Sequence, residues 1–268
     1  MSARTSDAAD AVARLTAAQN DRTPCAPVRD LLPEGDLSAA YAVQSSIIGA
    51  RTTAGASLVG RKIGLTNPKV QAQLGVDQPD FGVLLDDMQV TADEPVDITR
   101  LLQPKIEAEV AFVLASDLDQ PLVTEDDVTA ATGYILAALE IVDSRIADWD
   151  ITIVDTIADN GSSGLFVLGP GRVDIGGLDL PGVQMTLRSG GDTVSSGSGA
   201  DCLGNPLSAV AWLANTARDY GAPLRAGEVI LSGALGPMTP VQPGSSFTAD
   251  ITGLGTVTAS FTAAKDSS

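Results

Sequence analysis

The stretch Pro104-Lys105-Ile106-Glu107-Ala108-Glu109-Val110-Ala111-Phe112-Val113-Leu114 decides the fold that we expect for this chain. Every second residue from Ile106 to Leu114 is apolar, and Glu107 and Glu109 occupy positions between them. This period of two, supported by β-branched and aromatic residues, predicts a β-strand. Residues i and i+2 of a strand share a face roughly 7 Å apart, so Glu107 and Glu109 should lie side by side.

Two neighbouring carboxylates repel each other and raise one pKa unless a cation lies between them. Oxygen ligands on a rigid strand suit a hard divalent ion such as Mg²⁺ or Mn²⁺. The alternative is the solvated face of a half-exposed sheet, and this stretch alone does not decide between the two.

A third acidic residue, Glu140, lies in a long apolar run over residues 134–145 that predicts a buried strand. A lone buried carboxylate is costly unless it is paired or bound to a metal. Glu140 is therefore the natural third ligand beside Glu107 and Glu109. Asp143 or Arg145 could instead belong to a structural ion pair.

The short apolar strand expected over residues 58–66 is interrupted by Arg61-Lys62 and contains two glycines. Because neighbouring side chains alternate, only one of the pair should point easily to water. A partly buried Lys62 is a candidate electrostatic or acid/base group, and a surface charge at a strand end is the alternative. Asp80, in a loop expected over 76–82, is a candidate base or substrate contact, or else an Asx-turn acceptor.

The chain contains no histidine, which excludes Ser-His-Asp and Cys-His hydrolysis and imidazole metal ligands. Acid and base catalysis must come from Asp, Glu, Lys, Tyr or water. The net charge of −18 makes nucleic acids and anionic membranes unsuitable partners. Two cysteines outside any paired motif, and no apolar run of spanning length, lead us to expect a cytoplasmic protein.

The order of patterns predicts an α+β fold, with a mixed β-sheet roll or barrel and a helical N-terminal lobe. The lobe should cover residues 1–57, with helices over 6–20 and from Ser38, and the β-roll residues 58–268, in one compact unit. Further helices are expected after Thr124 and over 206–219. Further strands are expected over 165–168, 183–188, 192–197 and 246–261, and residues 229–237 should form a buried strand that runs into a glycine-rich turn.

Six ordered motifs together resemble the 2-keto-4-pentenoate (2-hydroxypenta-2,4-dienoate) hydratases of the fumarylacetoacetate hydrolase superfamily. The resemblance runs from about residue 28 to 261. The motifs are GRKIGLT at 60–66, QPDFG at 78–82, IEAE at 106–109, LEIVDSR at 139–145, DTIADN at 155–160 and GALGP at 233–237.

The resemblance implies a β-roll of the fumarylacetoacetate hydrolase C-terminal type and a divalent metal held by Glu107, Glu109 and Glu140. It also implies a catalytic role for Lys62 with Asp80 nearby. The family adds water to 2-hydroxypenta-2,4-dienoate, giving 4-hydroxy-2-oxopentanoate, in meta-cleavage catabolism of aromatic compounds. Relatives form homo-oligomers, and a pathway decarboxylase or aldolase is a possible associate.

Ser162 and Ser232 are weaker candidates for binding the substrate carboxylate. Asn205 stands where many relatives carry histidine, and we expect it to cap a helix. Two alternatives remain: a 4-oxalocrotonate decarboxylase that uses the same enolate-stabilising site, and a non-catalytic subunit that partners a related enzyme.

Overall fold

The computed structural model describes residues 2–67, 71 and 78–263 of the chain. The helix expected just after Asn67 falls on residues outside these ranges, as do residues 76 and 77 of the expected loop. Of the remainder of that loop, residues 78 and 79 lie in no helix or strand, whereas residues 80–82 belong to strand β2, Asp80–Leu85.

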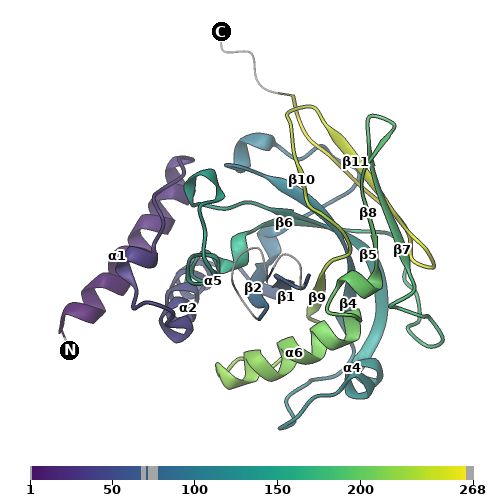
Figure 1. Cartoon of the computed structure of the whole chain (residues 1–268), viewed down its shortest axis with the longest axis horizontal. Coiled ribbons are helices and arrows are strands. Elements are labelled where there is room, and N and C mark those ends of the chain that lie inside the picture. Colours follow the sequence, from purple (N-terminus) through teal and green to yellow (C-terminus); the bar gives the residue numbers. More distant parts are fainter. Residues whose placement is uncertain (1, 68–70, 72–77, 264–268) are drawn as a thin grey trace.

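Five α-helices are found among the described residues, and they lie on the outside of a curled sheet (Figure 1). α1 and α2 pack against each other, and α2 also packs on α5, so these three gather at one side. α6 packs against α4 and strand β9. The helices are α1 Ser2–Asp21, α2 Leu37–Thr53, α4 Glu125–Ala131, α5 Ile153–Ala158 and α6 Pro206–Asp219.

The larger sheet has eight strands in the order β2-β1-β9-β4-β5-β6-β3, with β10 paired to the free part of β4. It is mixed, since β1 runs parallel to β9 and β3 parallel to β6, whereas the other pairs are antiparallel. Its strands are β1 Leu58–Gly64, β2 Asp80–Leu85, β3 Gln89–Val90, β4 Lys105–Leu114, β5 Thr132–Val142, β6 Ser163–Leu168, β9 Val229–Ala234 and β10 Thr239–Pro240.

A second sheet of four antiparallel strands, in the order β12-β11-β7-β8, packs against β5 and β6 of the first. β11 shows the period of two that predicted it, because Phe247, Ala249 and Ile251 are buried and the residues between them are exposed. This sheet therefore closes the roll by covering one face of the long strands. Its strands are β7 Gln184–Ser189, β8 Asp192–Ser198, β11 Ser246–Ile251 and β12 Gly255–Ser260.

Local signals placed two of four helix starts correctly. Thr124 caps α4 by accepting a hydrogen bond from Asp127 N, and Asn205 caps α6 by accepting one from Leu207 N. Two starts were misplaced: α1 begins at Ser2 rather than near Ser6, and Asp36, not Ser38, caps α2. The long strand expected to reach Arg145 ends at Val142.

The α+β fold with a rolled mixed sheet is confirmed. One hydrophobic core contains residues of the helices α1 and α2 as well as residues of both sheets. The division at residues 57 and 58 into a helical lobe and a β-roll stays a prediction, because this core is continuous across it. No helix in the described part of the chain is long and apolar enough to cross a membrane.

Candidate metal and catalytic site

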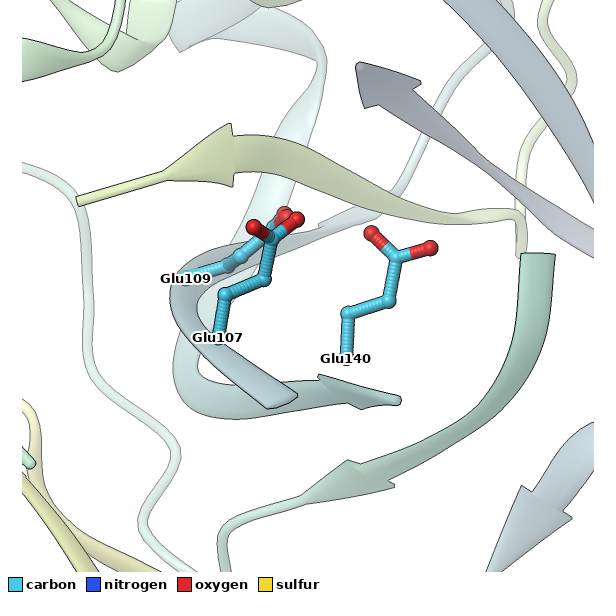
Figure 2. Close-up of side chains that lie close together, drawn as sticks. All are labelled: Glu107, Glu109 and Glu140. Carbon is cyan, nitrogen blue, oxygen red and sulfur yellow. The ribbon is translucent and has the colours of Figure 1, made fainter. Parts of the chain in front are cut away.

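Three carboxyl groups meet in the middle of the larger sheet. Glu107 on β4 stands directly opposite Glu140 on β5, and Glu109 lies two residues further along β4. One carboxylate oxygen from each lies within 4.8 Å of the others. Figure 2 shows the three carboxyl groups turned to the same side of the two strands. The strand period thus brings together all three predicted ligands.

These carboxyl groups are buried, with residue exposures of 8% for Glu107, 0% for Glu109 and 1% for Glu140. The alternative of a solvated strand face is therefore wrong. Gly233 N donates a hydrogen bond of 2.7 Å to Glu109 Oε2, but Glu109 Oε1 and Glu140 Oε2 have no partner, and Glu140 Oε1 has only an ion pair with Lys62. Unpartnered buried oxygens are costly, and a divalent cation is the group that three such carboxylates fit.

Burial dominates the protonation of this cluster. Loss of solvation, followed by repulsion from Glu140, raises the pKa of Glu107 to about 7. Burial and the same repulsion raise the pKa of Glu109 well above its usual range, and burial also raises the pKa of Glu140. A bound cation would reverse these shifts, because it favours the charged form of each ligand.

Lys62 on β1 is buried beside the three carboxyl groups, and its Nζ lies 3.2 Å from Glu140 Oε1. Burial alone would lower the pKa of this lysine, but Glu140 and Asp80 outweigh it and raise the pKa above its ordinary value. Lys62 is therefore a cation at neutral pH. The expectation that Arg61 or Lys62 points to water is wrong, since Arg61 is also buried and pairs with Glu228 at 3.2 Å.

Asp80 begins β2, opposite Gly64 of β1, and is also buried. A Cβ at Gly64 would lie 2.2 Å from Asp80 Oδ1, so only glycine leaves room for this carboxyl group. Burial raises the pKa of Asp80, although Lys62 opposes the shift. Its Oδ2 accepts no hydrogen bond. These features favour the interpretation of Asp80 as a base or substrate contact over that of a turn acceptor.

A cavity of about 370 Å³ opens beside the cluster. One part of its wall is polar and includes Lys62, Asp80, Glu107 and Ser162. The other part is apolar. The site can therefore hold a small molecule with a charged head and an apolar tail. The residues contributing apolar side chains include Ile63, Leu65, Val142, Trp149, Ile151, Ala234, Pro237 and Met238.

Ser162 and Ser232 are placed differently by the structure. Ser162 lines the cavity, as the prediction for it requires. Ser232 is fully buried on β9 and is not among the lining residues, although its Oγ has no hydrogen-bond partner. The carboxylate-binding roles of both serines stay predictions.

The short turn Asn160–Ser162 positions Ser162 through unusual backbone geometry. Its three residues all have left-handed φ angles, of 57°, 60° and 51°. Asn160 Oδ1 accepts a hydrogen bond from Val83 N, and its Nδ2 donates one to Val83 O. Left-handed non-glycine residues cost of order 1–3 kcal/mol and persist only where surrounding contacts hold them. The amide of Asn160 is such a contact.

Arg145 forms a buried ion pair with Asp159 at 2.5 Å and donates to the carbonyl of Ser163. Asp143 accepts hydrogen bonds from the backbone N–H groups of Leu102 and Gln103. The interpretation of Asp143 and Arg145 as structural residues is thus supported. Arg145 forms its ion pair with Asp159, and it bonds to Asp143 only through the backbone carbonyl of that residue.

Sequence reasoning missed Trp149 and Thr156 as cavity residues. Thr156 lines the cavity, and its hydrogen bond to Asp80 opposes the rise in the pKa of Asp80 that burial causes. Trp149 donates from Nε1 to Gln103 O at 3.1 Å, and Lys105 Nζ lies 4.1 Å from its ring centroid. A tryptophan six residues after Asp143, in a chain with only two, was a usable signal.

The chain matches the family model described as fumarylacetoacetate (FAA) hydrolase C-terminal over residues 58–262. The chain belongs to this family. A 2-keto-4-pentenoate hydratase of Paraburkholderia phymatum is 52% identical over 93% of this chain and 95% of its own length. A 2-hydroxyhexa-2,4-dienoate hydratase of Comamonas testosteroni is 43% identical over 93% and 95%.

Among solved structures, the 4-oxalocrotonate decarboxylase of Pseudomonas putida G7, complexed with magnesium and adipate, superposes with a TM-score of 0.91. It is 35% identical and covers 96% of this chain and 98% of its own. The fold is therefore shared over almost the whole length of both chains.

Proposed function

We propose that this chain is a hydro-lyase that adds water to 2-hydroxypenta-2,4-dienoate and releases 4-hydroxy-2-oxopentanoate in meta-cleavage catabolism of aromatic compounds. The observation that carries the proposal is the buried cluster of Glu107, Glu109 and Glu140 beside Lys62, facing a cavity of about 370 Å³. Relatives of about half-identical sequence that are named 2-keto-4-pentenoate hydratases support it.

Glu107, Glu109 and Glu140 would hold a divalent cation, and Mg²⁺ or Mn²⁺ is our proposal for the ion. When bound, that ion supplies Lewis-acid stabilisation of negative charge on the substrate oxygens. The unpartnered oxygens of Glu109 and Glu140 support this use of the cluster.

Lys62 supplies a fixed positive charge where the 2-oxygen of the substrate becomes an enolate. The raised pKa of this lysine keeps it protonated, so its main effect is electrostatic. Asp80 has a raised pKa and an unpartnered Oδ2, and it lines the same cavity. It is therefore suited to exchange a proton with the substrate or with the attacking water.

The chemistry separates into two proton movements. Protonation at carbon 5, with loss of the proton of the 2-hydroxyl group, converts the dienol into an enone, which makes carbon 4 electrophilic. Water then adds its oxygen at carbon 4 and a proton at carbon 3. Apolar residues such as Trp149 and Met238 would surround this carbon tail and limit competing water, while Ser162 would bind the carboxylate end.

Decarboxylation of 4-oxalocrotonate is the second candidate. The observation that favours it is the TM-score of 0.91 to a decarboxylase that bears that name. Both reactions need the same stabilised enolate, so the site geometry permits either. The sequence identity of 52% to hydratases, against 35% to this decarboxylase, favours hydration.

An ultraviolet assay with freshly generated 2-hydroxypenta-2,4-dienoate, with and without Mg²⁺ or Mn²⁺, tests the proposal. We expect metal-dependent loss of the dienol absorbance and 4-hydroxy-2-oxopentanoate as the product. No turnover, together with carbon dioxide release from 4-oxalocrotonate, would assign the chain to the decarboxylases instead. No turnover of either compound and no metal binding would support the non-catalytic subunit.

Three further proposals accompany the activity. The protein would form homo-oligomers, would associate with a pathway decarboxylase or aldolase, and would reside in the cytoplasm. Cys25 and Cys202 are both free, which is compatible with a reducing compartment.

A further inference from the structure

Four arginines surround a cleft on the side of the molecule where α1 and α2 lie. The cleft encloses about 120 Å³ and is lined by Arg22, Arg51, Arg100 and Arg145. The whole chain has only 16 basic residues against 34 acidic ones. Four cations at one small cavity are therefore a marked concentration of positive charge in a protein that is otherwise acidic.

The carboxylates near this cleft are already engaged. Asp87 pairs with Arg51 at 2.6 Å, and Asp159 pairs with Arg145 at 2.5 Å. Asp143 accepts its hydrogen bonds from backbone N–H groups. Local carboxylates therefore leave part of the cationic lining uncompensated.

The other two arginines form no close ion pair with a carboxylate among the described residues. Arg22 follows the last residue of α1, and its charge opposes the rise in the pKa of the nearby Asp143 that burial causes, without a direct ion pair. Arg100 donates to the backbone carbonyl of Asp87 at 2.8 Å but likewise pairs with no carboxylate. Two exposed guanidinium groups at one cleft are free to bind an anion, and the planar fork of each matches a carboxylate.

An apolar cavity of about 290 Å³ adjoins this cleft. It lies between α1 and α2, where Leu15, Ile47 and Ile48 contribute to its wall. The two cavities share lining residues, so they lie next to each other. Together they present a cationic mouth and an apolar chamber. The shared residues are Gln19, Arg51, Arg145 and Ser163.

We propose that this arginine cleft and its apolar chamber form a second binding site, separate from the catalytic cavity, for a small organic carboxylate with an apolar tail. The carboxylate binds Arg22 and Arg100, and the tail packs between α1 and α2. The shape and charge of the paired cavities fit such an anion better than an inorganic one, which would leave the chamber unfilled.

The floor of the chamber connects this site to the catalytic cavity. Asn160 and Ser163 line the chamber, and Gly161 and Ser162 between them line the catalytic cavity. The turn is held in left-handed geometry by local contacts. An occupant of the chamber would stiffen this turn and so change how the catalytic cavity binds substrate.

Isothermal titration of the full-length protein with hexanoate tests the site. The double variant Arg22→Gln/Arg100→Gln removes the two free guanidinium groups. Arg172→Gln/Arg188→Gln makes the same charge change at two exposed arginines that line neither cavity. We expect hexanoate affinity to fall roughly tenfold or more in the first variant and to stay within about twofold in the second. Hexan-1-ol, which has the tail but no charge, should bind weakly to all three proteins.

Equal hexanoate affinity in both double variants, or no binding to the unaltered protein, would overturn the proposal. Conversion of an oligomer into monomers by Arg22→Gln/Arg100→Gln would also overturn it, because the cleft would then be an interface between copies. Binding is measured without turnover, so this result is independent of the proposed hydratase activity. Where turnover is found, a hexanoate-dependent KM in the unaltered protein but not in the first variant would support the connection through residues 160–162, and an unchanged KM would contradict it.

Discussion

Glu107 combines the most accessible position of the three carboxyl groups with a pKa near neutrality. We expect Glu107→Gln to weaken Mg²⁺ or Mn²⁺ binding on the order of a hundredfold or more, because one charged ligand becomes neutral. Titration calorimetry would measure the loss of metal affinity, and the dienol assay would measure the accompanying loss of turnover. Glu94→Gln, an exposed residue outside the site, is the matched control and should change neither. Full metal binding by Glu107→Gln would remove this residue from the ligand set.

Metal affinity should depend on pH with a defined sign. A proton on Glu107 competes with the metal, and the pKa of this group in the metal-free protein is about 7. Above that pH the carboxylate is ready to bind, and below it each ion must displace a proton. We therefore expect affinity to fall about tenfold per pH unit below pH 7 for one displaced proton, and more steeply where Glu109 is protonated as well. Calorimetry at pH 6 and pH 8 would measure it, and a flat profile would contradict the raised pKa.

Lys62 should affect turnover without being needed for metal binding. Lys62→Met removes the positive charge beside Glu140 while keeping a similar shape. We expect kcat to fall by about 10²–10³-fold at saturating metal, which is typical of removing one group that stabilises an oxyanion. Metal affinity should be unchanged or higher, because a neighbouring cation is lost. Arg188→Met, at an exposed position, is the control. Weaker metal binding with unchanged kcat would assign Lys62 to the support of the ligands only.

For single residues, the sequence predicted the cluster of Glu107, Glu109 and Glu140 because the position of each carboxylate is energetically unfavourable without a partner. A carboxylate amid the apolar residues around Glu140 and two carboxylates at spacing two are both unfavourable without a partner. Ser232 carried no such signal, since hydroxyl groups are tolerated in many settings. Its distance from the cavity wall depends on how β9 packs, which local sequence does not encode.

Among the elements, the turn that contains Trp149 contributes to the wall of the catalytic cavity. Lys105 on β4 pairs with Val142 on β5, two residues along the strands from the pair Glu107 and Glu140. Two residues of a strand span about 7 Å. The ring of Trp149 lies next to Lys105 and is held by Gln103. A substituent on carbon 5 of a substrate bound at the carboxylates would therefore point toward this ring.

Trp149→Ala should consequently change substrate preference. We expect kcat/KM for 2-hydroxyhexa-2,4-dienoate, relative to 2-hydroxypenta-2,4-dienoate, to rise roughly tenfold, because the added methyl group gains room and hydrophobic pockets discriminate a methylene by about 1–3 kcal/mol. Competition assays with both dienoates would give the ratio directly. Trp212→Ala, at the other tryptophan, is the control. An unchanged ratio, with both rates reduced equally, would mean that Trp149 only supports the turn.

Element boundaries show where local patterns end and tertiary structure decides. Thr124 and Asn205 were found as caps because their side chains bond to the nearby backbone. Arg61 was expected near water but is buried, because β1 lies between β2 and β9 and Glu228, 167 residues away, supplies its partner. An ion pair of that sequence separation leaves no local signal.

At the scale of the whole molecule, the alternating patterns predicted a rolled mixed sheet but not the order of its strands. β1 runs parallel to β9, although residues 65–228 separate them in the sequence, and this pairing brings Lys62 beside strands β4 and β5. The family resemblance supplied what periodicity could not, namely that Lys62 and Asp80 belong with the carboxylates. The catalytic cavity is thus formed by strands that are distant in the sequence and adjacent in the sheet.

Metal binding should stabilise the whole fold, not a local loop. The three carboxyl groups lie on β4 and β5, which are inner strands of the larger sheet and carry much of the core. A ligand that binds only the folded state at 100 times its Kd adds about 2.7 kcal/mol. For a chain of this size that amounts to a rise in Tm of roughly 5–10 °C. Calorimetric melting with and without Mg²⁺ would measure it.

Glu109→Gln provides the most informative comparison for this prediction. The amide can still accept the hydrogen bond from Gly233 N, and Glu140 remains to pair with Lys62, so the variant should fold. It also replaces a buried carboxyl group whose ionised form is disfavoured by burial and by repulsion from Glu140 and Glu107. We therefore expect the metal-free variant to melt at or above the Tm of the metal-free parent and to gain little from Mg²⁺. An equal gain in Tm from Mg²⁺ in both proteins would place the stabilising ion elsewhere. A lower Tm of the metal-free variant would show that the carboxyl group of Glu109 does not destabilise the metal-free parent.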